Sequence, residues 1–178
     1  MDFTNGFTAQ ALEGFQKCIS SLEIPPDQGW FSRYAIARIR HESGLSDLRS
    51  IIQGYAEAYD FCPARLEPVA HLARLYREQG DQQTAYELSR LVLTTPRPDE
   101  SALFLEAVVY DLLLPLEFVL ACRSLGRGSE SAHVAEYLLA LPELPGAVRQ
   151  LVLGNKDDLS HSYRSEYLTF VLPGWWET

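Results

Sequence analysis

Residues 72–81 read Leu72-Ala73-Arg74-Leu75-Tyr76-Arg77-Glu78-Gln79-Gly80-Asp81, and this stretch decides the fold. Its first seven residues place apolar side chains at helical spacing, which predicts the end of an amphipathic helix. Gly80 is typical of a residue that ends a helix, and Asp81 is typical of a residue that caps the next one. The stretch therefore predicts a helix, a short turn and a second helix.

The same arrangement occurs 36 residues earlier in the chain (80 − 44). Ala37 precedes Gly44 by seven residues, just as Ala73 precedes Gly80. A third unit ends its first helix at Gly126. A period of roughly 34 residues, built from two helices and a turn, is the signature of tetratricopeptide-type repeats. These units predict a repeated helix-turn-helix structure.

The fold class that we expect is all-α: a tetratricopeptide-like helical-repeat solenoid of about three degenerate repeats, with terminal helices and an aromatic C-terminal tail. Small residues let two helix backbones approach, so Ala73 and Ala85 are predicted to lie where the helices of the middle repeat cross. The whole chain forms one domain in this interpretation. Its parts are an N-terminal helix and linker (7–29), three repeats (30–63, 64–100 and 101–142), and a capping helix with the tail (143–178).

Proline and capping residues predict the helix boundaries after the middle turn. A helix capped by Asp81 is expected to end near Thr95, before two prolines. The next helix is expected to begin at Asp99 or Ser101 and to end near Leu112. Because proline is tolerated in the first turn of a helix, Pro115 is predicted to begin a separate helix.

The composition is that of one soluble globular domain. The chain has 178 residues, of which 47% are apolar and 22% are charged. Its 15 basic and 24 acidic residues give a net charge of −9, which argues against general binding to nucleic acid or to an anionic membrane. The three cysteines show neither a disulfide framework nor zinc spacing. No leader or membrane-spanning pattern is present, so we expect a cytoplasmic protein.

The links between the repeats carry a family resemblance. The stretch from Tyr55-Ala56-Glu57-Ala58-Tyr59-Asp60-Phe61-Cys62-Pro63 to Pro68, and then residues 72–81, resemble the tetratricopeptide regions attached to bacterial family-2-type glycosyltransferases. The resemblance covers roughly residues 30–140. Cys62 stands where that family usually carries an arginine. The chain has no Asp-x-Asp motif and too few residues for a nucleotide-sugar fold, so the resemblance implies the accessory scaffold without the catalytic domain.

The first helix of each repeat is expected to line a concave groove. Projection of these helices places one group of polar side chains on that face: Tyr34, Arg38, His41, Arg74, Arg77 and Arg123. The arginine guanidinium suits carboxylates because its planar fork donates two parallel hydrogen bonds. One interpretation is a clamp for an acidic peptide segment or a chain terminus. The alternative is that Glu42, Glu67 and Glu78 neutralise these arginines on a solvated helix face.

Sequence patterns give no candidate catalytic residue and no candidate cofactor. The four histidines include no H-E-x-x-H pair, so metal binding is not expected and His71 is interpreted as a surface or packing histidine. No nucleophile elbow, phosphate-binding loop or dinucleotide fingerprint is present. Arg65 and Glu67, before Pro68, are interpreted as a structural pair between adjacent repeats.

The C-terminal tail is rich in large apolar side chains, among them Tyr167, Phe170, Trp175 and Trp176. Aromatic side chains are costly to leave in water. We expect the tail to cover the last helix pair, because the ends of a solenoid need capping. The alternatives are docking onto a partner or onto a second copy of the chain.

Together, these patterns predict a non-enzymatic protein-interaction scaffold. The resemblance implies that this scaffold is accessory to a bacterial glycosyltransferase system, and the expected protein partner is an acidic segment or the transferase. Neither nucleic acid nor a membrane is expected as a partner. Two alternatives stay open: a homo-oligomerisation scaffold, and a sugar-nucleotide-binding or glycosyltransferase-related enzyme with an unrecognised site.

Overall fold

The computed structural model describes residues 3–21, 23–44 and 46–154, and all regular structure within these ranges is helical. The α-helices, in chain order, are α1 (Phe3–Ile19), α2 (Pro26–Ser43), α3 (Leu48–Phe61), α4 (Glu67–Glu78), α5 (Gln82–Ser89), α6 (Leu114–Ser124), α7 (Ala132–Ala140) and α8 (Gly146–Leu153). Two 3₁₀ turns, η1 (Arg90–Leu93) and η3 (Gly128–Ser131), and a π-helical segment, η2 (Val109–Leu113), complete the set. The all-α fold class is therefore confirmed.

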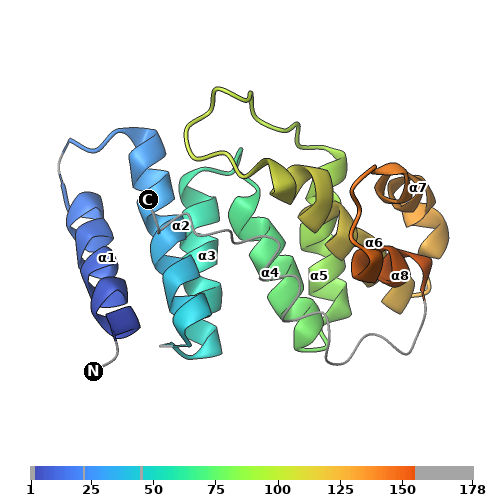
Figure 1. The fold of residues 1–178 in the computed structure, drawn as a ribbon, viewed down its shortest axis with the longest axis horizontal. Helices are drawn as coiled ribbons and strands as arrows, with labels where there is room; N and C mark the ends of the chain where they lie inside the picture. Colours follow the sequence, from blue (N-terminus) through green and yellow to red (C-terminus); the bar gives the residue numbers. More distant parts are fainter. Residues whose placement is uncertain (1–2, 22, 45, 155–178) are drawn as a thin grey trace.

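Each α-helix contacts the next one along the chain, from α1 to α8. Figure 1 shows α1 to α5 side by side in a single row, with α6, α7 and α8 at the far end. The helix α4 also contacts α6, and α6 also contacts α8. The chain is therefore an array in which most packing is between sequence neighbours.

Glycine ends the first helix of each expected repeat in the left-handed conformation. Gly44, Gly80 and Gly126 have φ angles of 64°, 84° and 71°. A residue with a Cβ atom adopts this conformation only at a cost, which explains why glycine stands at all three turns. Asp47 and Asp81 cap the helices that follow, accepting hydrogen bonds from the backbone N–H groups of Ser50 and Thr84, both at 3.0 Å.

Small residues lie where helices cross. A Cβ atom added to Gly54 on α3 would lie 3.0 Å from the Cβ atom of Ala37 on α2. Ala37, Ala73 and Ala85 are all fully buried, and α4 packs against α5 as the middle repeat requires. Backbones can approach this closely only because these side chains are small.

The core has two parts. One is aromatic and lies between α2, α3 and α4, around the fully buried Trp30, Tyr34 and Tyr55. The other is mainly aliphatic and extends from α4 to α8, around Leu66 and Leu114. No described helix combines the length and the apolar character needed to cross a membrane.

The expected helix from Asp99 or Ser101 to Leu112 is wrong in its first half. Residues 94–106 contain only turns and irregular structure, and helical structure begins at residue 107. Phe104 has a φ angle of 59°, which interrupts a right-handed helix. Asp99 caps only a short turn, through the backbone N–H of Ser101 at 2.9 Å. The helix after Asp81 also ends earlier than expected: α5 ends at Ser89 and η1 ends at Leu93.

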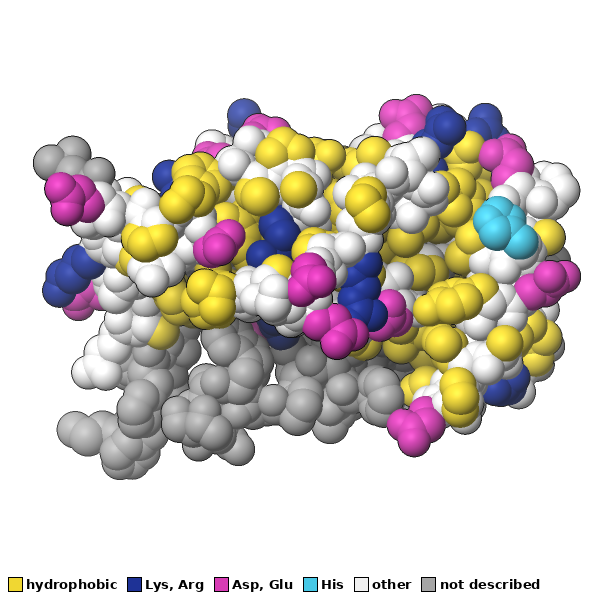
Figure 2. Space-filling model, turned by 90° about the horizontal axis from the view of Figure 1, so that it is seen from above, with side chains coloured by type: hydrophobic (Ala, Val, Ile, Leu, Met, Phe, Trp, Pro, Cys, Tyr) yellow, Lys and Arg dark blue, Asp and Glu magenta, His cyan; other side chains and the backbone are white. Residues whose placement is uncertain are grey.

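The 94–106 segment returns to α2, where the Phe104 ring stacks on the Phe31 ring with centroids 4.0 Å apart. It forms the long irregular connection at the top of Figure 1. Leu103 and Phe104 nevertheless stay exposed. Figure 2 shows the upper face of the molecule as a mixture of hydrophobic, basic and acidic side chains.

Pro115 lies in the first turn of α6, as expected, but α6 is not a separate helix, which corrects part of the second boundary expectation. Instead, α6 follows directly from η2 in one helical run from residue 107 to residue 124. The backbone N–H of Leu114 donates to the carbonyl of Val109, one residue further back than in an α-helix. This wider turn accommodates a proline that would otherwise clash with the preceding turn.

Candidate functional site

Three predicted groove residues lie on one stripe of α2. Tyr34, Arg38 and His41 are spaced four and three residues apart, which places them on one face of the helix. The helix begins at Pro26, a proline in its first turn, and ends at Gly44. Between these boundaries, α2 packs against α3.

Across from this stripe, α3 and α4 contribute Tyr55 and His71. The hydroxyl of Tyr34 lies 3.0 Å from Nε2 of His71, and the hydroxyl of Tyr55 lies 3.1 Å from Nδ1 of His41. The Tyr55 and His71 rings stack with centroids 4.8 Å apart and an angle of 4° between their planes. Two tyrosines and two histidines therefore form one cluster, here called the Tyr–His cluster, across three helices.

Neither Tyr55 nor His71 was predicted as a site residue. The signal in the sequence is position: His71 precedes Arg74 by three residues, so the two side chains share one face of α4. Tyr55 carried no such signal, because its place depends on how α3 packs against α2. Tertiary packing, which helical periodicity does not describe, brings it to His41.

Burial keeps three members of this cluster, Tyr34, Tyr55 and His71, uncharged at neutral pH. Burial lowers the pKa of His71 well below its ordinary value, and the nearby charges of Arg38, His41 and Arg74 lower it further. Burial also raises the pKa of Tyr34 and Tyr55 well above the ordinary value. Tyr34, Tyr55 and His71 are therefore neutral hydrogen-bonding groups beside arginines.

Arg38 lies beside the cluster and holds two carboxylates. Its Nε is 2.8 Å from Oε1 of Glu42, and its Nη1 is 2.6 Å from Oε1 of Glu106. Its side chain is only 4% exposed. Burial raises the pKa of Glu106, whereas Arg38 and a side-chain hydrogen bond from Tyr34 lower it. The last residue of the 94–106 segment is thus tied to α2.

The other predicted arginines also have partners within the chain. Nε of Arg74 lies 2.8 Å from Oε1 of Glu78, one helical turn away. Nε of Arg77 lies 2.5 Å from Oε2 of Glu117 on α6. Glu42 and Glu78 therefore pair with predicted groove arginines, as the alternative interpretation expected.

Arg123 lies apart from these residues. Its Nη1 and Nη2 donate to the carbonyls of Leu151 and Val152 in the last turn of α8. The last turn of a helix leaves carbonyls without a partner in the helix, so the Arg123 guanidinium satisfies two of them. The tail residues Tyr167, Phe170, Trp175 and Trp176 lie outside the described residues.

Arg65 and Glu67 form the structural pair that the sequence predicted. Nη2 of Arg65 lies 2.7 Å from Oε1 of Glu67, which is fully buried. The same guanidinium donates to the carbonyls of Leu103 and Phe104, at 3.0 and 2.9 Å. It also stacks over the Trp30 ring at 3.8 Å. This pair fixes the 94–106 segment against α2 and α4.

The arrangement offers no metal centre within the part of the chain that the structure describes. No group of three or more histidine, cysteine, aspartate or glutamate side chains is placed to hold an ion there. Cys18, Cys62 and Cys122 are free thiols. We call the surface formed by the predicted groove residues of α2 and α4 and by His71 the α2–α4 face. Its side chains interact through hydrogen bonds and ion pairs.

Comparison of the chain with models of protein families, with curated proteins and with solved structures finds no match in any of the three. The fold and the site define the class instead: an all-α array of sequential helices with a Tyr–His cluster and paired arginines on its α2–α4 face.

Proposed function

We propose that the chain is a tetratricopeptide-type helical-repeat scaffold that binds another protein and carries out no reaction of its own. The observation that carries this proposal is the repeated hairpin. Ala37 and Ala73 are fully buried seven residues before Gly44 and Gly80, and both glycines are left-handed. Stacked helical hairpins of this kind present extended surfaces for binding other chains.

We propose an acidic peptide segment as the partner of the α2–α4 face. Arg38 and Arg77 pair with Glu106 and Glu117, whose side chains are 21% and 1% exposed, so these ion pairs are part of the folded structure. Arg74, whose side chain is 11% exposed, pairs with Glu78, whose side chain is 36% exposed. Glu78 is the most exposed of the carboxylates paired with these arginines, so a carboxylate of the partner replaces it at the least cost.

The pathway in this proposal is bacterial glycosylation. Its support is the resemblance of residues 55–68 and 72–81 to tetratricopeptide regions attached to family-2-type glycosyltransferases. The chain would then serve as an accessory to a separate transferase. The partner segment would come from the transferase or from a protein that the transferase modifies.

The test is a titration of the full chain with a fluorescent glutamate-rich peptide, followed by anisotropy. We expect Arg74→Glu to weaken binding about tenfold or more, because it places like charges at the contact. Arg49→Glu on α3 is the matched control, since Arg49 is exposed and the change in net charge is the same. Equal loss in both variants would show that only the overall charge matters and would overturn the assignment.

Two further measurements separate the alternative functions. A mass that rises with concentration, and no peptide binding, would favour a homo-oligomerisation scaffold. Saturable binding of a nucleoside-diphosphate sugar that is lost in Arg74→Ala would favour the enzyme or sugar-nucleotide binder.

A further inference from the structure

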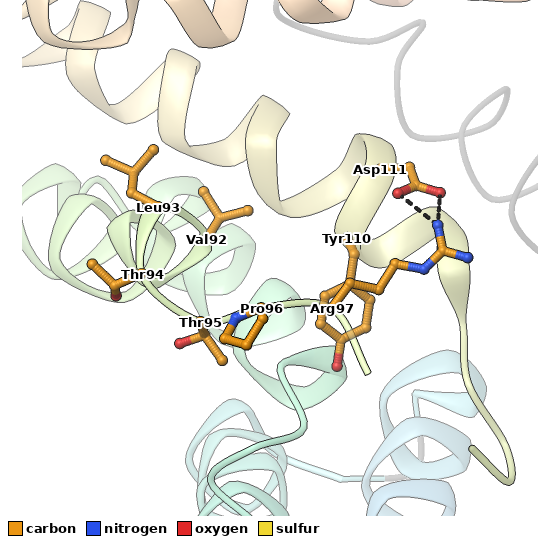
Figure 3. Close-up of a pocket in the computed structure, with 8 residues that line it drawn as sticks. All are labelled: Val92, Leu93, Thr94, Thr95, Pro96, Arg97, Tyr110 and Asp111. Carbon is orange, nitrogen blue, oxygen red and sulfur yellow. Dashed lines mark hydrogen bonds and ion pairs between the residues drawn. The ribbon is translucent and has the colours of Figure 1, made fainter. Parts of the chain in front are cut away.

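An open cavity of about 390 Å³ lies between η1, the chain that follows it, and η2. Figure 3 shows Val92 and Leu93 on one side, with Pro96 and the Tyr110 ring in the middle of the lining. Ligand cavities are typically 300–1,000 Å³ and mainly apolar, with a few polar groups that fix orientation. This cavity is at the small end of that range, and its lining mixes apolar side chains with Thr94, Thr95, Arg97 and Asp111. Its size suits one large side chain.

The polar groups gather at one edge of the cavity. Nη1 of Arg97 lies 2.7 Å from Oδ2 of Asp111 and 3.0 Å from Oδ1 (Figure 3). Nη2 of Arg97 lies 3.1 Å from Oε1 of Glu100. One guanidinium thus faces two carboxylates, and this edge carries a net negative charge. All three side chains are partly or largely exposed, so neither ion pair is strong.

Two large apolar side chains, one on η1 and one on α7, stay exposed. Leu93 lines the cavity and is 45% exposed, and Tyr137 on α7 is 46% exposed. Burial raises the pKa of the Tyr137 phenol, the charge of Asp111 raises it further, and the charge of Arg97 lowers it.

We propose that this cavity binds a partner peptide segment in which a lysine or arginine stands beside a large apolar side chain. The apolar side chain enters the cavity against Leu93, Pro96 and the Tyr110 ring. The cation pairs with Asp111, while Arg97 keeps Glu100. Charge complementarity identifies this occupant, because Arg97 offsets only one of the two carboxylates at this edge.

This site goes beyond the proposed function, because it lies on another surface and takes a partner of opposite charge. Arg74 and the Tyr–His cluster play no part in it. A failure of the glutamate-rich peptide to bind therefore leaves this proposal standing, and the reverse also holds.

The experiment titrates the full chain with three labelled peptides of equal length. One alternates lysine with leucine, a second replaces lysine with glutamate, and a third replaces leucine with serine. We expect the lysine–leucine peptide to bind about tenfold more tightly than either of the others. Asp111→Asn should weaken its binding about fivefold or more, because the carboxylate that meets the cation is lost.

Arg97→Gln gives the sharpest result. It removes the competing guanidinium, so it should strengthen binding of the lysine–leucine peptide severalfold; an anionic occupant would be bound more weakly instead. Asp60→Asn is the matched control for Asp111→Asn, because Asp60 is exposed on α3 and the charge change is the same. Leu93→Ser tests the apolar wall without touching the ion pairs, and it should also weaken binding.

Four results would overturn the proposal. Preference for the glutamate peptide would identify an acidic occupant, and equal binding of the serine peptide would show that the cavity is not used. Equal effects of Asp111→Asn and Asp60→Asn on peptide affinity would show that only the overall charge of the chain matters. Absence of binding at a peptide concentration of about 1 mM would show that no such site exists.

Discussion

The Arg77 guanidinium on α4 forms an ion pair with the carboxylate of Glu117 on α6, with Nε and Oε2 2.5 Å apart. A second hydrogen bond joins Nη2 to Oε1 at 3.2 Å. The Glu117 side chain is only 1% exposed, so its charge depends on this arginine for compensation. The pair links helices that are 40 residues apart in sequence.

Removal of Arg77 should therefore strongly destabilise the fold. We expect Arg77→Met to lower the free energy of unfolding by about 3–5 kcal/mol, because it leaves a buried carboxylate without its partner. The double variant Arg77→Met with Glu117→Leu should recover most of that loss, since no buried charge remains. Urea unfolding of the wild type, both single variants and the double variant gives the coupling energy. Additive single effects would show that the two side chains do not interact in solution.

The repeated turns could be predicted from sequence because their cause is local. Glycine at positions 44, 80 and 126, each followed by a short polar turn, indicates a left-handed helix end whatever the rest of the chain does. Asp47 and Asp81 cap their helices through backbone groups three residues away. Signals of such short range remain valid in the folded chain.

The 94–106 segment could not be predicted in the same way. Its conformation depends on Arg65, whose guanidinium donates hydrogen bonds to the carbonyls of Leu103 and Phe104, 38 and 39 residues further along the chain. Glu106 depends likewise on Arg38, at a separation of 68 residues. The helix signals after Asp99 are local, and these distant contacts stabilise an irregular conformation instead of a helix.

The candidate site was predictable in part for the same reason. Tyr34, Arg38 and His41 share one stripe of α2, and helical spacing alone places them together. The partner carboxylates on other elements, Glu106 and Glu117, were missed because they come from the irregular segment and from α6. Sequence spacing identifies a face, whereas the packing of other elements decides what covers it.

The Tyr110 hydroxyl should contribute more to the free energy of unfolding than an exposed tyrosine hydroxyl does. It donates to Oε2 of Glu67 at 2.8 Å and accepts from the backbone N–H of Leu66 at 2.9 Å. Tyr110→Phe leaves both groups buried with one partner fewer, so we expect a loss of about 1–3 kcal/mol in the free energy of unfolding. Tyr137 is 46% exposed and no hydrogen bond is found for its hydroxyl among the described residues, so Tyr137→Phe should change the free energy of unfolding by less than about 0.5 kcal/mol. Chemical denaturation measures both, and equal losses would contradict the role given to Tyr110.

Two glycines should respond to alanine in opposite directions. Gly80 has a φ angle of 84°, so Gly80→Ala should destabilise the fold by about 1–2 kcal/mol although no neighbour would clash. Gly14 lies within α1, and a Cβ atom there would meet nothing within 4 Å. Gly14→Ala should therefore stabilise the helix by about 0.5–1 kcal/mol. Thermal unfolding followed by circular dichroism compares them, and a destabilising Gly14→Ala would argue against the helical conformation at that position.

The Tyr–His cluster should make stability depend on pH. Burial lowers the pKa of His71 in the folded state, while in the unfolded chain its pKa stays near 6.5. Below that value the unfolded chain binds a proton that the folded chain does not, so the free energy of unfolding falls as the pH falls. The contribution of His71 is fully present above about pH 6.5 and decreases by up to about 1.4 kcal/mol for each pH unit below it.

Glu106 acts in the opposite direction, and the measurement must separate the two groups. The pKa of Glu106 is raised in the folded state. As the pH falls toward the ordinary pKa of glutamate, the folded chain therefore binds a proton that the unfolded chain does not, and the contribution of Glu106 to the free energy of unfolding rises. His71→Gln keeps Glu106 and Arg38, retains a hydrogen-bonding side chain for Tyr34, and cannot gain the proton. We therefore expect the wild type to lose more stability than His71→Gln between pH 7.5 and pH 5.5, by an amount of about 1 kcal/mol. Parallel pH profiles for the two proteins in urea unfolding would show that His71 takes up protons equally in both states and that its burial has no effect on its pKa.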